Sequence, residues 1–369
     1  MSEPVDYIGH MNESIQSLLK DALRISLRHP SMALYILRTM LRQRKAARRR
    51  ARWDGCGIHV PPFLIASITS RCNLHCKGCY ARAHQRPIAS EMTLDRWLAI
   101  LDEARDLGVS FILLAGGEPL LRRDILDATR RFPEIVFPVF TNGLLLDNAL
   151  IAQFREQKNV IPVMSLEGYS EETDGRRGVG VYDQLKRLIA RMNGGLFFGV
   201  SLTVTRLNFE TVTGEEFIKG LLESGCSLFF FVEYVPVKEG TEDWVPTPEQ
   251  RARLLGLVHS FRSRLPGLFI AFPGDEAEMG GCLAAGRGFA HISPEGDLEP
   301  CPFAPYSDTS LTGARLREGL QSGLLRTIRD NHEMLSETGG GCALWQNRDW
   351  LRSLAGSSAG HRGAGAEKP

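Results

Sequence analysis

Three cysteines stand close together in the segment TSRCNLHCKGCY, at Cys72, Cys76 and Cys79, with the spacing C-x3-C-x2-C. Thiolates are soft ligands that select zinc or iron–sulfur clusters. Structural zinc usually takes four protein ligands in two separated pairs, whereas this loop supplies one triplet with His75 inside it. A [4Fe-4S] cluster held by three cysteines leaves one iron open to a small molecule. The loop therefore favours such a cluster, with zinc or plain structural cysteines as the alternatives.

A second short motif follows the next apolar run of the chain. The segment LLAGGEPLLR places Gly116 and Gly117 directly after a predicted strand. Glycines allow the backbone to approach a neighbouring group closely, and Glu118 and Pro119 fix the turn. A lone Gly-Gly pair predicts only a tight turn, but here it comes one strand–helix unit after the cysteine loop, so we expect both at the same edge of a sheet.

Together the two motifs resemble those of the radical S-adenosylmethionine (radical SAM) superfamily, in which an aromatic residue, here Tyr80, follows the cysteine triplet. The resemblance covers residues 63–235. It implies an enzyme whose open iron is chelated by the amino and carboxylate groups of S-adenosylmethionine (SAM). Reduction of the cluster then yields a 5′-deoxyadenosyl radical that abstracts hydrogen from a substrate, while the protein positions and shields the cofactors. It also implies an electron donor such as flavodoxin or ferredoxin.

The resemblance extends to the ends of two later strands. It implies that Asn142 in TNG and Ser165 in SLEG hydrogen-bond the ribose or methionine part of SAM, and that Arg177 in ETDGRRG faces the SAM carboxylate, which suits the fork of a guanidinium. Each residue also has an alternative role: Asn142 could belong to a turn, Ser165 could cap the following segment, and Arg177 could form a surface ion pair. The predicted cofactor-binding residues are Tyr80, Gly116, Gly117, Glu118, Pro119, Asn142, Ser165 and Arg177.

A second set of cysteines occurs near the C-terminus. Cys282, Gly296 and Cys301 follow the pattern C-x13-G-x4-C, and Cys342 comes later. This resembles the opening of the SPASM or twitch extension, but the chain lacks the cysteine run C-x2-C-x5-C-x3-C that completes the SPASM form. The resemblance implies one auxiliary iron–sulfur cluster, with a fourth ligand from elsewhere or an open iron; structural zinc or free thiols are the alternatives. Cys226 is expected to be a buried small hydrophobe, and Cys56 stays unassigned.

The elements that must position these residues follow from the hydrophobic pattern. Short apolar runs alternate with amphipathic helical segments, such as one capped by Thr93 and Gly108, which indicates a parallel sheet covered on both faces. Six such units predict an α/β fold, a partial (β/α)6 TIM-like barrel with its chemistry at the carboxyl ends of the strands. The predicted strands are 63–69, 110–115, 135–141, 160–166, 196–205 and 227–235.

A hairpin and two candidate catalytic residues are also predicted. The hairpin is expected to turn at Glu295–Gly296. Glu233 and Tyr234 end the sixth strand, where they could act as acid, base or radical relay; packing or backbone binding is the alternative.

The predicted domains of the chain are a basic helical N-terminal segment (1–55), a radical SAM partial barrel (56–265), a small SPASM/twitch-like auxiliary-cluster domain (266–355) and a disordered tail (356–369).

The N-terminal segment is strongly basic. It reads as two helices separated at His29–Pro30, and no acidic residue occurs from Arg38 to Arg52. Such a run is most often a solvated helix face; the alternative is docking to an anionic partner or membrane surface. The net charge of +1 gives no global attraction to nucleic acid, and no specific nucleic acid is expected.

Composition suggests a compartment but no substrate. Eight cysteines among 369 residues are too few for a secreted disulfide scaffold, the N-terminus is unlike a secretion signal, and no apolar run reaches the length of a spanning helix. A cytoplasmic location is expected. The family resemblance implies a substrate that is a peptide or protein, or else a small molecule from a lipid or cofactor pathway. A zinc-stabilised binding module without catalysis is the alternative from another class.

Overall fold

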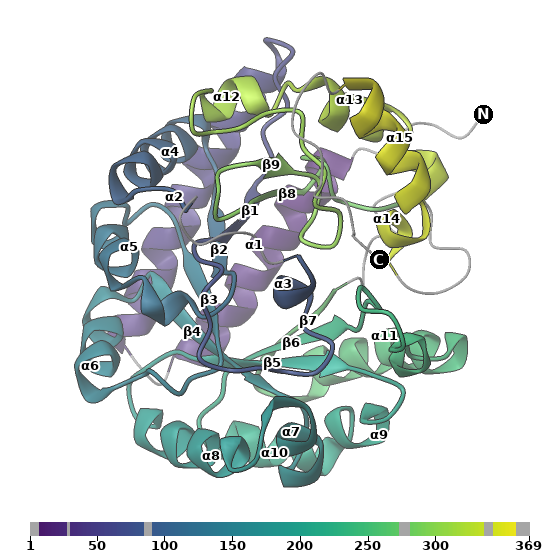
Figure 1. Ribbon diagram of the computed structural model, residues 1–369. Coiled ribbons are helices and arrows are strands. Elements are labelled where there is room, and N and C mark those ends of the chain that lie inside the picture. Colours follow the sequence, from purple (N-terminus) through teal and green to yellow (C-terminus); the bar gives the residue numbers. More distant parts are fainter. Residues whose placement is uncertain (1–6, 28–29, 85–90, 273–280, 336–341, 359–369) are drawn as a thin grey trace.

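The computed structural model describes residues 7–27, 30–84, 91–272, 281–335 and 342–358. Its centre is a curved sheet in the strand order β7-β6-β5-β4-β3-β2-β1-β8-β9 (Figure 1). All neighbouring strands are parallel except β8 and β9. The predicted α/β partial barrel is therefore confirmed. The strands are β1 (Phe63–Ser67), β2 (Phe111–Ala115), β3 (Phe137–Thr141), β4 (Val160–Leu166), β5 (Gly199–Val204), β6 (Leu228–Glu233), β7 (Leu268–Phe272), β8 (Phe289–Ile292) and β9 (Leu298–Glu299).

The sheet is larger than the six predicted strands. Each of those six segments contains a strand, but β7 also pairs with β6 and β8 with β1. Both extra strands come from residues that the sequence assigns to the C-terminal extension. An open parallel sheet leaves unpaired backbone groups at its edges, and the short apolar runs LFIAF and FAHI satisfy them. The predicted hairpin is present as β8 and β9, with Gly296 at φ +96° in its turn.

Helices cover the outside of the sheet, as Figure 1 shows for α4 (Leu94–Leu107), α5 (Arg123–Ala128), α6 (Asn148–Gln157) and α8 (Val181–Met192). Thr93 caps the start of α4 by accepting from the backbone N–H of Arg96, and Gly108 ends it with φ +96°, as predicted. The core lies between these helices and the sheet and includes fully buried Trp97, Phe154 and Phe231. The other α-helices that follow β1 along the chain are α3 (Tyr80–Ala83), α7 (Ser170–Arg177), α9 (Phe209–Val212), α10 (Glu215–Glu223), α11 (Pro248–Arg264), α12 (Leu316–Gly319), α13 (Gly323–Asp330), α14 (Ala343–Gln346) and α15 (Arg348–Ser358).

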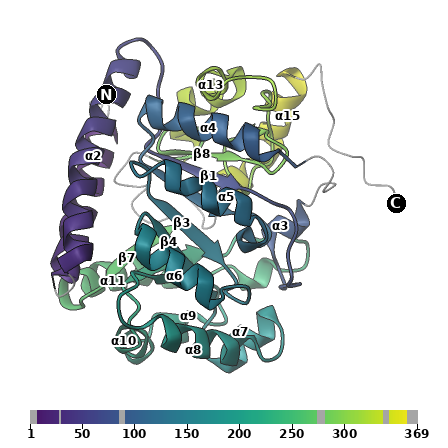
Figure 2. The same cartoon turned by 90° about the vertical axis from the view of Figure 1, so that its left-hand side faces the viewer.

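The N-terminal segment forms the two predicted helices, α1 (Tyr7–Ser26) and α2 (Pro30–Asp54). They pack against one another and against the first residues of several strands, such as Leu228 and Leu268. Arg50 is buried and donates to the carbonyl oxygen of Gly108, at 2.6 Å, and to two side chains. The helical hairpin therefore closes the amino-terminal end of the partial barrel (Figure 2).

None of the helices in the described ranges combines the length and the hydropathy that a membrane span requires. The predicted tail lies outside the described residues from position 359 onward, whereas residues 356–358 belong to α15.

Candidate functional site

The three-cysteine loop leaves the carboxyl end of β1. Cys72, Cys76 and Cys79 are partly buried. Burial raises the pKa of Cys72, and the negative charges of Glu118 and of the neighbouring thiolates raise it further. The loop contains Gly78 at φ +64°, where a Cβ atom would lie 2.3 Å from the hydroxyl oxygen of Tyr234. The glycine thus lets the loop pack on the strand ends with its thiols gathered, and a bound metal centre would relieve the repulsion among thiolates.

The glycine motif after β2 lies directly against this loop. The backbone N–H of Gly117 donates to the carbonyl oxygen of Thr69 at 2.7 Å, and that of Glu118 donates to the carbonyl oxygen of Arg71 at 2.7 Å. A Cβ on Gly116 would lie 2.3 Å from the Thr69 oxygen, and one on Gly117 would lie 2.1 Å from the Arg71 oxygen. Only glycine permits this approach, so the predicted meeting of the two motifs is observed.

Glu118 joins the ends of β2 and β3. Its buried carboxylate accepts from the hydroxyl of Thr141 at 2.6 Å and from the backbone N–H groups of Asn142 and Leu120. Burial raises the pKa of Glu118 against the opposing effect of these hydrogen bonds. Pro119 follows as the first residue of a short 3-10 turn. Glu118 therefore holds the backbone of Asn142 in place.

Asn142 in turn reaches the cysteine loop. Its side-chain amide donates to Asn73 at 2.7 Å and lies 3.9 Å from the sulfur of Cys72. Its side-chain oxygen accepts from the backbone N–H of Leu144, which closes the turn anticipated from the Asn-Gly pair. Ser165, partly buried near the end of β4, lies two strands from the glycine motif in the sheet order.

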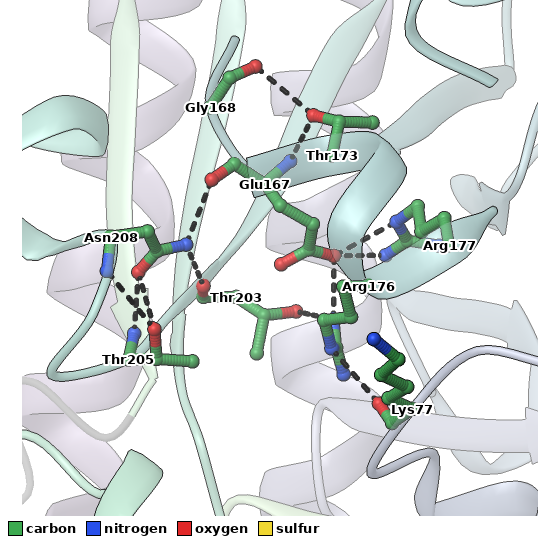
Figure 3. Close-up of polar contacts among 9 residues, drawn as sticks. All are labelled: Lys77, Glu167, Gly168, Thr173, Arg176, Arg177, Thr203, Thr205 and Asn208. Atoms are coloured by element: carbon green, nitrogen blue, oxygen red, sulfur yellow. Dashed lines mark hydrogen bonds and ion pairs between the residues drawn. The ribbon is translucent and has the colours of Figure 1, made fainter. Parts of the chain in front are cut away.

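Arg177 belongs to a buried charge cluster beyond β4, drawn in Figure 3. Its guanidinium donates to Glu167, with an Nε–Oε1 distance of 2.8 Å, and Arg176 donates to the same oxygen at 2.5 Å. Burial opposes the charge of Arg177, but Glu167 and the thiolate of Cys76 raise its pKa overall. Arg177 thus lies between a carboxylate and the cysteine loop, and it is not a surface residue.

The same cluster ties the cysteine loop to the barrel. Arg176 donates to the carbonyl oxygen of Lys77 at 3.3 Å, and the backbone N–H of Lys77 donates to the carbonyl oxygen of Arg176 at 2.9 Å. Asn208 donates to the backbone carbonyl oxygen of Glu167 at 2.8 Å (Figure 3). Glu167, Arg176 and Asn208 were not among the predicted site residues. Glu167 is the acidic residue of the SLEG segment itself and Arg176 directly precedes Arg177, whereas nothing in the sequence singles out Asn208.

Glu233 and Tyr234 take different positions after β6. The carboxylate of Glu233 is buried and pairs with Arg251 of α11 at 2.7 Å. Tyr234 is buried beneath the cysteine loop, with its ring 5.9 Å from the Arg176 guanidinium carbon. Burial raises the pKa of Tyr234. The structure therefore brings Tyr234 to the site and directs Glu233 to an ion pair.

The second set of cysteines also comes together. Cys282 and Cys301 are buried and Cys342 is partly buried. Burial first, and then the neighbouring thiols of Cys342 and Cys282, raise the pKa of Cys301. Cys226 is buried in the loop just before β6, where burial raises its pKa; it fits the predicted small hydrophobe.

The donor chemistry of both sets suits iron–sulfur clusters. Each set offers three thiols, the ligands that such clusters take. Across the described ranges, no three His, Cys, Asp or Glu side chains are arranged around a position for one metal ion. The thiols that bind a four-iron cluster stand further apart than ligands of one ion, because each binds a different iron.

A buried polar chain links the two cysteine sets. The hydroxyl of Ser67, at the end of β1, lies 2.8 Å from Nε2 of His291, and Nδ1 of His291 lies 2.7 Å from Glu299. Ser67 also hydrogen-bonds Tyr80, whose pKa is raised by burial. These residues line a small cavity with Gly116 and Gly117. Ser67, His291 and Glu299 were not among the predicted site residues, although His291 and Glu299 are conspicuous polar residues in an apolar hairpin.

Replacing Ser67 with alanine is expected to lower the free energy of unfolding by about 1–3 kcal/mol, because buried His291 and partly buried Tyr80 both lose a hydrogen-bonding partner. Urea unfolding of the variant measures this. The matched control is Ser263→Ala, since the exposed Ser263 hydroxyl donates only within α11 and should change stability by less than about 0.5 kcal/mol. Equal effects of the two substitutions would contradict a structural role for the buried chain.

Comparison with known proteins agrees with this geometry. Residues 66–231 match the model of the Radical SAM superfamily, and the chain belongs to that superfamily of enzymes, which use a [4Fe-4S] cluster and SAM. The predicted membership and enzymatic class are confirmed.

Individual relatives are more distant. The chain is 28% identical over 312 residues to an AdoMet-dependent heme synthase of Methanosarcina barkeri, covering 76% of this chain and 88% of that protein. It is 27% identical to the mycofactocin maturase MftC of Mycobacterium tuberculosis over 74% of each chain. The crystal structure of Streptococcus suis SuiB bound to S-adenosylmethionine matches with a TM-score of 0.62 and 20% identity, covering 84% of this chain and 75% of that one, which supports the fold.

Proposed function

We propose that Cys72, Cys76 and Cys79 hold the [4Fe-4S] cluster of this radical SAM enzyme and that SAM binds beside it, at the carboxyl ends of the strands. One observation carries the proposal: the glycine motif, Asn142 and Arg177 come from three separate segments and all reach the three-cysteine loop. When bound, the cluster and SAM supply a 5′-deoxyadenosyl radical that removes hydrogen from a substrate.

The side chains divide the remaining work. Arg177 places a positive charge with little solvent contact beside the thiolates, where a carboxylate of SAM would be attracted. Gly116 and Gly117 line the adjacent cavity, where their backbone could contact the methionine part. The side-chain amide of Asn142 and the hydroxyl of Ser165 would serve as hydrogen-bonding groups for SAM. Glu118 and Pro119 act as positioning residues, since the carboxylate of Glu118 is already occupied by three hydrogen bonds.

Tyr80 and the residues after β6 complete the assignment. Tyr80 joins the cysteine loop to the Ser67–His291 chain. We assign Tyr234, which lies beneath the loop, as the candidate acid, base or relay, in preference to Glu233, which is paired with Arg251. Cys282, Cys301 and Cys342 would hold the auxiliary cluster of a SPASM/twitch-like extension. A reducing protein such as flavodoxin or ferredoxin would deliver electrons to the enzyme in the cytoplasm.

The proposed substrate is a peptide or protein. The chain is similar over most of its length to the mycofactocin maturase and, at 27% identity over 69% of this chain and 70% of that one, to the PqqA peptide cyclase of Granulibacter bethesdensis. A small-molecule substrate of the tetrapyrrole class is the second candidate, because the heme synthase is matched over 88% of its length.

Anaerobic purification tests the proposed function. The expected protein is brown, contains about eight irons per chain if both sites hold four-iron clusters, and releases 5′-deoxyadenosine from SAM after reduction with dithionite. A colourless protein that binds zinc and leaves SAM intact after iron–sulfide reconstitution would refute it. Mass spectrometry of incubations with a precursor peptide encoded nearby, or with an iron tetrapyrrole, then separates the two substrate classes.

A further inference from the structure

The outer face of the N-terminal hairpin carries a row of exposed leucines. Leu34, Leu37 and Leu41 of α2 are 48%, 47% and 59% exposed, and Leu27, beside the turn between α1 and α2, is 64% exposed. The spacing of the three α2 leucines places them on one helix face. A single exposed leucine is ordinary, but a contiguous apolar group on one edge indicates an interaction surface.

The same helix face continues as a basic surface. Arg44, Lys45, Arg48 and Arg52 follow Leu41 at helical spacing and are exposed, and the structure gives none of them an ion pair with another described residue. No acidic residue occurs between Asp21 and Asp54. We call this set, with the four leucines, the α2 surface.

Other arginines of the run have structural partners. Arg42 donates to the carbonyl oxygen of Pro133, Arg49 donates to that of Arg105 at 2.8 Å, and Arg50 is buried. The basic run therefore has two parts, one that fixes the hairpin to the barrel and one that faces outward. The outward part is not needed to hold the helix in place.

The α2 surface lies on the opposite side of the molecule from the cysteine loop. The inner faces of α1 and α2 pack on the amino-terminal ends of the strands, whereas the cysteines follow the carboxyl end of β1. In Figure 2 the hairpin forms one outer side of the molecule. A partner bound there would leave the candidate active site open.

We propose that the α2 surface docks the enzyme on an anionic lipid surface. The exposed leucines of the α2 surface can enter the boundary between headgroups and acyl chains, and the arginines and lysine that follow them on the same helix can reach lipid phosphates. A second copy of the chain fits this surface less well. If the α2 helices of two copies paired in parallel, their basic residues would face and repel one another; if they paired antiparallel, the leucines of one copy would face the arginines of the other. An acidic protein would satisfy the arginines but gives no role to the exposed leucines.

Vesicle co-sedimentation of the full-length protein tests this. We expect binding to vesicles of phosphatidylcholine with phosphatidylserine, little binding to phosphatidylcholine alone, and release at high salt. Arg44→Gln combined with Lys45→Gln should weaken the partition coefficient about tenfold or more, and Leu37→Gln with Leu41→Gln should weaken it as well. SAM cleavage in solution should not change in either variant.

The matched control is Lys186→Gln with Arg187→Gln, which removes the same charge from exposed positions of α8 and should leave vesicle binding unchanged. Circular dichroism confirms that each variant is folded. The proposal is overturned if the control weakens binding as much as the α2 variant, if phosphatidylserine makes no difference, or if the wild-type protein does not bind. Sedimentation velocity that shows a dimer lost on leucine replacement would assign the surface to a second copy instead.

Discussion

Replacing Cys72, Cys76 and Cys79 together with alanine is expected to remove about half of the iron and to abolish formation of 5′-deoxyadenosine. Arg177 lies close enough to the thiols of Cys76 and Cys79 to interact with their charges, and the side-chain amide of Asn142 lies 3.9 Å from the sulfur of Cys72. Iron held by the second set should survive, since a four-iron cluster there depends on different thiols. Iron and sulfide analysis, with chromatography of the nucleoside product, measures both effects.

Two further variants make this result specific. Replacing Cys282, Cys301 and Cys342 should remove the other half of the iron and leave the loop cluster. Replacing exposed Cys56, which no cluster is proposed to use, should change neither iron content nor SAM cleavage. If the loop variant kept all its iron, or if the Cys56 variant lost as much, the assignment of the loop would be wrong.

Replacing Glu167 with alanine is expected to lower the free energy of unfolding by about 3–5 kcal/mol, because it leaves two arginines with little solvent contact and without their carboxylate. The Glu167 side chain is 1% exposed, and those of Arg176 and Arg177 are 14% and 10% exposed. Because Arg176 also holds Lys77 of the cysteine loop, SAM cleavage should fall as well. Urea unfolding and product formation below the unfolding transition measure the two effects.

An exposed ion pair elsewhere in the chain provides a matched control, in which an arginine also loses its carboxylate partner. Glu210 pairs with Arg253 at 2.8 Å, but both side chains are more than half exposed. An exposed pair contributes only about 0–1 kcal/mol, so Glu210→Ala should have a small effect on stability and none on SAM cleavage. Similar losses in both variants would show that the Glu167 cluster is no more than a surface ion pair.

Local features of the sequence predicted much of the site. The cysteine spacing, the Gly-Gly-Glu-Pro motif and the caps of α4 depend on residues a few positions apart, so they can be read without knowing the fold. The cofactor assignments for Asn142 and Arg177 came from resemblance, and the structure adds their contacts with the cysteine loop. Six strands were predicted because each is a distinct apolar run.

Partnerships between distant residues could not be read in this way. Ser67 meets His291 across more than two hundred positions of sequence, and β8 joins the sheet beside β1 although it follows β7 along the chain. Such pairs depend on which strand occupies a free sheet edge, and many short apolar runs could do so. The same reason explains why β7 and β8 were assigned to the extension.

The sequence by itself determined the two thiol triplets, the glycine-rich turn and the basic helices, because composition and short spacing decide ligand chemistry and helix formation. Only the tertiary structure decided that Arg177 is a buried partner of Glu167, that Glu233 turns to Arg251, and that α2 presents leucines and arginines away from the cysteines. Those outcomes depend on burial, and burial is set by the packing of whole elements on one another.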